Sequence, residues 1–239
     1  VREDYALVVQ DIRGTLFSSR ETELFYADGW RPDLHDGRDT ADWITAQPWS
    51  NGKIGTTGES GLGMPAYLIG PSTPKVNAQF IIKSPPNFYE HALFHGGVLR
   101  EDLVIRWLSV MGRADMIEKY RNQQLYGAFW KPYETLSQVA NTPAAGFFVS
   151  AWYDVFQQGI LDAFTTREYA PDSASRGKNY LVMLPDTHDP CLTKDYRFQK
   201  KDGPKIGDLR RRFFSYELRG DPHALDGLPK VQYFVLGAD

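Results

Sequence analysis

The hexapeptide Gly58-Glu-Ser-Gly-Leu-Gly63 lies between a predicted strand, Lys53–Thr57, and a predicted helix, Met64–Ile69. A serine among glycines at such a junction is typical of a nucleophile elbow, a tight turn that lifts the serine hydroxyl above the end of a strand. The backbone N–H of Gly61 would then point at a developing oxyanion. The usual pattern is Gly-x-Ser-x-Gly, and here the second glycine comes one position later. On this hexapeptide alone, a glycine-rich turn without chemistry is the simpler interpretation.

An acidic residue and a histidine follow this serine in the order that a catalytic triad on a parallel sheet requires. Asp154 comes after the predicted strand Gly146–Ala151, and His188 after the predicted strand Asn179–Leu184. Taken singly, Asp154 could be a helix N-cap and His188 a histidine of a surface loop. Because order, spacing and placement agree at all three positions, we predict a triad of Ser60, Asp154 and His188.

Further apolar runs predict strands at Tyr5–Val9, Asn77–Ile82 and Val231–Leu236. Unbroken apolar strands are typical of a parallel sheet that is covered on both faces. Helical patterns alternate with the strands, at Asp36–Gln47, Met64–Ile69, Leu99–Met111, Val155–Thr165 and Asp208–Leu218. We therefore expect an α/β fold with a mostly parallel sheet.

The pattern changes at Ser84-Pro-Pro86, and residues 84–141 are helical in character and rich in aromatic side chains. We interpret them as a helical cap inserted into a core formed by residues 1–83 and 142–220, with residues 221–239 as a linker and a strand. Four aromatic residues are candidates for the wall of an acyl pocket beneath this cap: Phe129, Trp130, Trp152 and Phe156.

The amino-acid composition of the chain excludes several classes of protein. The 239 residues are 42% hydrophobic and 24% charged, which is ordinary for a globular chain. Lys and Arg number 27 against 30 Asp and Glu, and this net charge of −3 argues against a nucleic-acid partner. No apolar run approaches the roughly 18 residues of a membrane span. Cys191 is the only cysteine, so no intrachain disulfide is expected.

The sequence gives little support for a metal site or for a nucleotide-binding site. His91 and His95 are spaced as metal ligands on one helix face, but a glutamate in the metalloprotease position and a third ligand are missing, which favours a packed or pocket-lining role. A nucleotide-binding fold would need a Gly-x-Gly-x-x-Gly or P-loop sequence after the first strand, and neither occurs. We expect no metal and no cofactor.

Several linked motifs resemble the cocaine-esterase-like (CocE/NonD) serine hydrolases, relatives of X-Pro dipeptidyl peptidases and α-amino acid ester hydrolases. They run over nearly the whole chain and include Gln10-Asp-Ile-Arg-Gly14, Gln47-Pro-Trp-Ser-Asn-Gly-Lys-Ile-Gly55, Phe94-His-Gly-Gly97 and Ala151-Trp-Tyr-Asp154. The resemblance implies an α/β-hydrolase fold with Ser60, Asp154 and His188 as its triad. It also implies an acyl-enzyme and a small ester, amide or short peptide as substrate.

The chain departs from that family in several places. Gly61 stands where the family usually has a tyrosine, and Leu184-Pro-Asp-Thr-His-Asp189 replaces a Gly-Pro-Trp-Thr-His-Gly pattern. The family also takes an oxyanion tyrosine from a segment before the strand at Tyr5–Val9. We therefore expect a truncated hydrolase that lacks its first strands and its C-terminal β-sandwich, which Val231–Leu236 would open. An inactive fragment that serves as a binding or structural module is the alternative. Oligomeric state and compartment stay open, with the cytoplasm slightly favoured.

Overall fold

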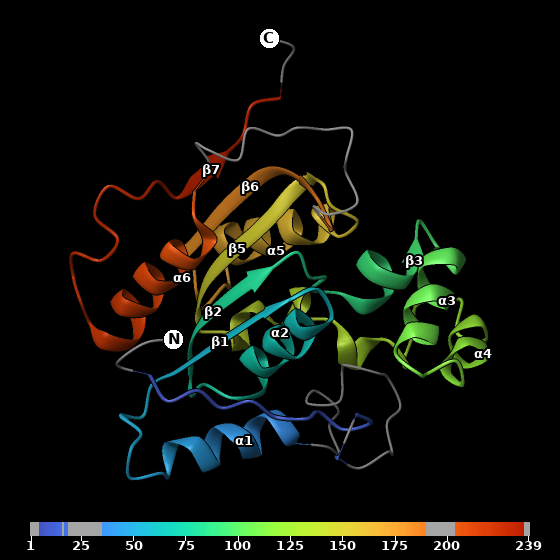
Figure 1. The fold of residues 1–239 in the computed structure, drawn as a ribbon, viewed down its shortest axis with the longest axis horizontal. Coiled ribbons are helices and arrows are strands. Elements are labelled where there is room, and N and C mark those ends of the chain that lie inside the picture. Colours follow the sequence, from blue (N-terminus) through green and yellow to red (C-terminus); the bar gives the residue numbers. More distant parts are fainter. Residues whose placement is uncertain (1–4, 16, 19–34, 190–203, 237–239) are drawn as a thin grey trace.

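A five-stranded parallel sheet forms the centre of the computed structural model, which describes residues 5–15, 17–18, 35–189 and 204–236 (Figure 1). Its strands are β1 (Ile54–Glu59), β2 (Val76–Ile82), β5 (Ala145–Tyr153), β6 (Asn179–Thr187) and β7 (Val231–Tyr233), in the order β1-β2-β5-β6-β7. All four neighbouring pairs are parallel. The expected α/β fold with a mostly parallel sheet is confirmed.

Successive side chains of the central strands point to opposite faces of the sheet, and both faces are covered. On one face Phe80 and Phe147 stack with ring centroids 4.7 Å apart and pack against Phe213. On the other face Ile81 and Phe148 pack in a second cluster. The helices are α1 (Asp36–Thr45), α2 (Gly63–Ser72), α3 (Glu101–Val110), α4 (Met116–Arg121), α5 (Gln157–Tyr169) and α6 (Ile206–Phe214). Helix α6 covers the first face, and α2 and α5 cover the second.

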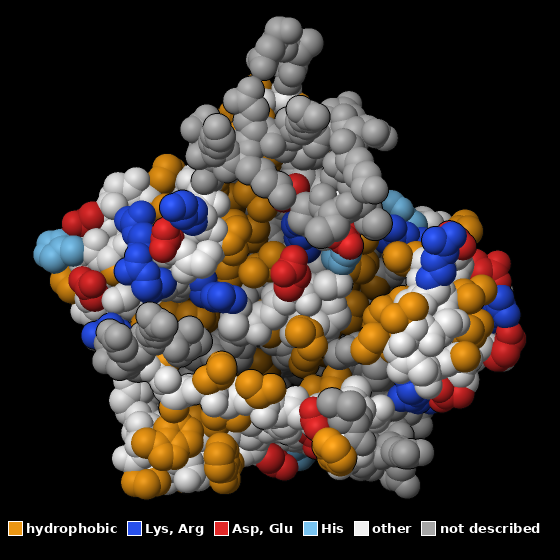
Figure 2. Space-filling model, in the orientation of Figure 1, with side chains coloured by type: hydrophobic (Ala, Val, Ile, Leu, Met, Phe, Trp, Pro, Cys, Tyr) orange, Lys and Arg blue, Asp and Glu red, His pale blue; other side chains and the backbone are white. Residues whose placement is uncertain are grey.

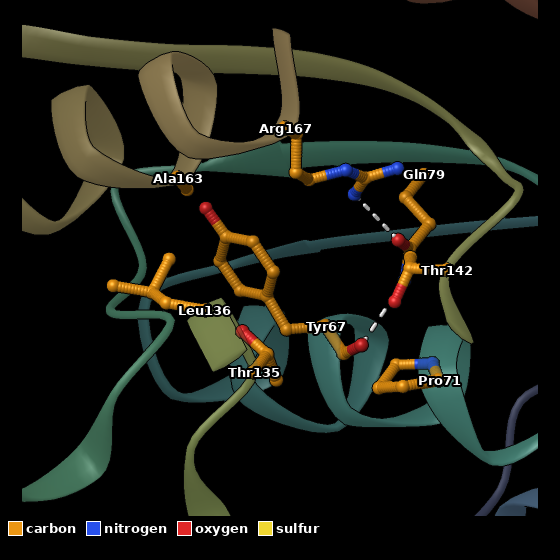
Figure 3. A pocket seen from close by; sticks show the side chains of 8 residues that line it. All are labelled: Tyr67, Pro71, Gln79, Thr135, Leu136, Thr142, Ala163 and Arg167. Atoms are coloured by element: carbon orange, nitrogen blue, oxygen red, sulfur yellow. Dashed lines mark hydrogen bonds between the residues drawn. The ribbon is translucent and has the colours of Figure 1, made fainter. Parts of the chain in front are cut away.

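A buried polar cluster joins α5 to the sheet (Figure 3). Arg167 of α5 is 4% exposed; it donates from Nη1 to Gln79 Oε1 over 2.8 Å and from Nη2 to the Ala144 carbonyl. Gln79 Nε2 in turn donates to the carbonyls of Ala66, over 2.5 Å, and Tyr67, over 3.2 Å, in α2. Burial lowers the pKa of Arg167 to about 10, so its guanidinium is still charged at neutral pH. One buried cation therefore links α5, β2 and α2.

The segment between β2 and β5, residues 84–141, holds α3, α4 and a small hairpin of β3 (Phe94–His95) and β4 (Val98–Leu99). Short helical turns complete it at Phe88–Leu93, Lys131–Tyr133 and Leu136–Asn141. Its aromatic side chains form a cluster of their own that also takes in Met64 and Leu68 of α2 and Phe156. The inserted helical segment thus packs on the side of the sheet that carries α2. The boundaries that divide it from the core stay a prediction.

One expectation about the strands is wrong, and a second is met over fewer residues. Residues 5–9 form no strand: Leu7 is 67% exposed and Val9 is 83% exposed, because no described segment pairs with them. The strand expected at 231–236 exists as Val231–Tyr233, but it pairs in parallel with β6 and extends the main sheet. Its expected place at the start of a C-terminal β domain stays a prediction. No helix of the described residues has the length and apolar character needed to cross a membrane.

Candidate active site

The elbow has the strained backbone that such a turn needs. Strand β1 ends at Glu59, a single 3-10 turn spans Ser60–Leu62, and α2 begins at Gly63. Ser60 adopts a φ of +55°, in the left-handed region that a residue with a side chain seldom occupies. Such strain costs on the order of 1–3 kcal/mol and is concentrated at functional sites. Ser60 is therefore held in a conformation that helix or strand formation alone would not select.

The glycines around Ser60 are required by close approaches. A Cβ on Gly58 would lie 2.1 Å from the carbonyl oxygen of Leu62, and a Cβ on Gly63 would lie 2.5 Å from Cβ of Ser84. Leu62, by contrast, is 65% exposed, so its position has room for a side chain. This explains the displaced second glycine: in this chain the helix meets the end of β2 at residue 63.

Replacing Gly58 by alanine should destabilise the elbow, because the new methyl group meets backbone that cannot rotate away. We expect the free energy of unfolding to fall by about 3 kcal/mol, the upper end for overpacking. Chemical denaturation measures this change. Gly52→Ala is the matched control, since nothing lies within 4 Å of a Cβ there, and its cost should come only from the positive φ of +81°. Equal losses for the two variants would contradict the close approach at residue 58.

The structure brings the three predicted triad residues together at one edge of the sheet. Ser60 Oγ lies 2.8 Å from His188 Nε2, and His188 Nδ1 lies 2.7 Å from Asp154 Oδ2. Ser60 directly follows β1, Asp154 follows β5 and His188 follows β6. The carboxyl ends of parallel strands meet at the same edge of the sheet. The Asp154 side chain is fully buried, whereas the His188 side chain is 28% exposed. The series thus runs from a buried carboxylate to a partly exposed serine.

Asp154 is fixed by a second hydrogen bond. Its Oδ1 accepts from the backbone N–H of Phe156 over 2.7 Å, which leaves Oδ2 for His188. The Phe156 ring stands perpendicular to the His188 ring, with centroids 5.0 Å apart. Arg100 donates to the Val155 carbonyl over 3.1 Å; burial lowers its pKa, and the charge of Asp154 partly opposes that shift. These contacts hold the carboxylate and the imidazole in one orientation.

The candidate pocket residues are divided by the structure. Phe156 contacts His188, as described above. Trp130 is 1% exposed and donates from Nε1 to the Gln123 carbonyl inside the inserted segment, and its place in a pocket wall stays a prediction. Trp152 donates to the Phe234 carbonyl over 2.7 Å and packs in the core cluster beside α5. Phe129 packs edge-on against Trp130 and is half-buried. Its role, like that of Gly61 beside Ser60, stays a prediction.

Hydrophobic side chains nevertheless gather along a hollow between the segment with α3 and α4 and the sheet-bearing body (Figure 2). Sequence reasoning missed one charged residue near the triad, Lys83, which donates to the carbonyl of Thr187. The available signal was a lysine directly after the apolar strand run Phe80-Ile-Ile82, at the edge of the sheet where the triad was expected.

The histidines considered as metal ligands have other surroundings. His91 is buried, with Nε2 3.0 Å from Asp162 Oδ2, and His95 is exposed in β3. Within the described residues no group of three or more His, Cys, Asp or Glu side chains is arranged to hold a metal ion. Cys191 lies outside the described residues.

The sequence of this chain is similar to those of known hydrolases. Residues 1–116 match the model of the X-Pro dipeptidyl-peptidase (S15) family. The whole chain aligns with the cocaine esterase of Rhodococcus sp. (strain MB1 Bresler) at 24% identity. These two matches support the resemblance of the chain to the CocE/NonD-like hydrolases. The chain spans 49% of that esterase.

Solved structures show the same fold. A CocE/NonD family hydrolase from Staphylococcus aureus superposes with a TM-score of 0.68 at 17% identity, covering 94% of this chain and 39% of that one. An aminopeptidase from a marine sediment archaeon, Thaumarchaeota archaeon, superposes with a TM-score of 0.64 at 18% identity, covering 84% and 40%. The chain therefore has an α/β-hydrolase-type fold with a mostly parallel sheet.

Proposed function

We propose that the chain carries the reaction centre of a serine hydrolase that cleaves an ester or an amide by acyl transfer to water. The observation that carries the proposal is the hydrogen-bonded series Ser60 Oγ, His188 Nε2 and Nδ1, and Asp154 Oδ2, with the serine on a strained turn. A serine beside a histidine that a carboxylate orients is the arrangement of an activated nucleophile.

Each residue has a defined task in the proposed mechanism. Ser60 Oγ attacks the substrate carbonyl while His188 Nε2 takes the hydroxyl proton. The resulting oxyanion would receive a hydrogen bond from the backbone N–H of Gly61, next to Ser60 at the entrance to α2. Asp154 accepts from His188 Nδ1–H and stabilises the imidazolium. When the tetrahedral intermediate collapses, His188 returns the proton to the leaving alcohol or amine, and Ser60 is left acylated.

Deacylation repeats these steps with water. His188 removes a proton from the attacking water, the acyl group leaves as a carboxylic acid, and the serine hydroxyl is restored. The substrate class is inferred from the relatives, whose names describe an esterase and peptidases. A small ester, an amide or a short peptide fits the proposal, and hydrophobic side chains along the hollow would favour an apolar acyl group.

The test is active-site labelling with a fluorophosphonate probe, followed by mass spectrometry of the labelled peptide. We expect one label per molecule, on Ser60, together with turnover of a p-nitrophenyl ester. Ser60→Ala should lose both. Ser72→Ala is the matched control, because Ser72 ends α2 and its hydroxyl donates to the Ile69 carbonyl within that helix. A protein that melts cooperatively but takes no label at Ser60 would contradict the proposal and favour a non-catalytic module.

A further inference from the structure

Lys83 is a buried cation directly after β2. It is 3% exposed, which costs its ammonium group hydration, and its φ of +45° is strained for a residue with a side chain. Its backbone N–H donates to the Val149 carbonyl over 2.7 Å, which continues the ladder between β2 and β5 by one residue. A residue kept in such a conformation needs compensating contacts from its side chain.

Those contacts lie at the end of β6. Lys83 Nζ donates to the carbonyl oxygen of Thr187 over 2.7 Å and lies 4.0 Å from Oδ2 of Asp186. Because β5 lies between β2 and β6, the lysine side chain reaches across one strand to make them. Asp186 also stands where the family resemblance leads one to expect a tryptophan. Lys83 and Asp186 are therefore two parts of one local arrangement.

We propose that Lys83 is a positioning residue for His188. The Thr187 carbonyl belongs to the planar peptide group that joins Thr187 to His188, so a bond that fixes this oxygen fixes the direction in which His188 leaves β6. Asp186 supplies the counter-charge that lets the ammonium remain in a buried place. Since Lys83 is buried, it acts on the imidazole through the backbone and not on the substrate. This inference rests on the proposed function.

The expected effect follows from the sensitivity of catalysis to small displacements. A misplacement of about 1 Å can cost on the order of 100-fold in rate. In Lys83→Met, which keeps the length of the side chain and removes the ammonium, we expect kcat for a p-nitrophenyl ester to fall about 10- to 100-fold. KM should change little, because no substrate contact is lost. Lys83→Arg, which restores a charged donor, should recover most of the loss.

The experiment measures kcat, KM, the rate of fluorophosphonate labelling and the thermal midpoint of each variant. The far-downfield proton resonance of the His188–Asp154 hydrogen bond gives a readout of imidazole placement, and it should broaden or shift in Lys83→Met. Lys75→Met is the matched control: that lysine precedes the same strand but bonds Thr45 and Asp42 at the surface. It should leave all these quantities unchanged.

Three outcomes would overturn the inference. One is a folded Lys83→Met variant with the wild-type kcat and proton resonance. Another is a variant whose KM and kcat change together and which Lys83→Arg does not rescue, because that pattern belongs to a general structural role. If Lys83→Met does not fold, Lys83→Gln takes its place under the same criteria. The third outcome is wild-type protein that takes no label at Ser60, which overturns the proposed function itself and the inference with it.

Discussion

Replacing His188 by glutamine should lower kcat/KM for an activated ester by about a million-fold, the loss that follows removal of the base from a serine–histidine pair. Without the imidazole, Ser60 Oγ loses its hydrogen-bond partner His188 Nε2, the group that takes the serine proton. The side chain is 28% exposed, so its removal leaves a small gap and the thermal midpoint should change little. Spectrophotometric turnover and the rate of probe labelling measure the loss.

His223→Gln is the control for this variant. His223 is exposed and bonds Asp226 over 2.9 Å, as His188 bonds Asp154, but it lies outside the site. Its substitution should leave turnover unchanged. The double variant Ser60→Ala/His188→Gln should be no slower than either single variant, because residues that act as one unit are not additive. Losses that multiply would show that the two residues do not work together.

The three residues of the proposed triad could be found from the sequence because two simple rules act on them. Each follows a recognisable apolar strand, and parallel strands bring their carboxyl ends to one edge of a sheet. These rules need no knowledge of side-chain packing, and Ser60, Asp154 and His188 meet at the expected edge. The second glycine, Gly63, departs from the usual elbow pattern. It is required at this position by a close approach to Ser84, which no local sequence pattern reveals.

What the sequence did not reveal depends on partners distant along the chain. The apolar run of residues 5–9 has strand character, yet a strand forms only where another strand can pair with it, and Val9 remains 83% exposed. The run at 231–236 has the same character, and it pairs because the edge of β6 is available. The sequence predicts Trp130 as part of a pocket wall, and in the structure its indole is enclosed by other aromatic rings of the inserted segment. Apolar character predicts burial but not which side of a cluster faces a ligand.

Asp154→Asn should lower kcat by about ten-thousand-fold while leaving the fold intact. Oδ1 of Asp154 accepts from the Phe156 N–H over 2.7 Å, so in the variant the amide oxygen keeps this place and the NH2 group must face His188. There it donates to Nδ1, where the carboxylate accepted. The imidazole is then held with its proton on Nε2, and it can no longer take the proton of Ser60.

The hydrogen bond from the Phe156 N–H to residue 154 also distinguishes the asparagine variant from the alanine variant. Asp154→Ala also leaves the buried Phe156 N–H without its acceptor, which costs about 1–3 kcal/mol in the free energy of unfolding, whereas Asp154→Asn should cost much less. Asp162→Asn is the matched control, because Asp162 bonds His91 over 3.0 Å in a second Asp–His pair away from Ser60. That variant should retain full turnover. An Asp154→Asn enzyme within about tenfold of wild type would mean that the carboxylate neither sets the tautomer of His188 nor stabilises its charge, and the role proposed for Asp154 would fail.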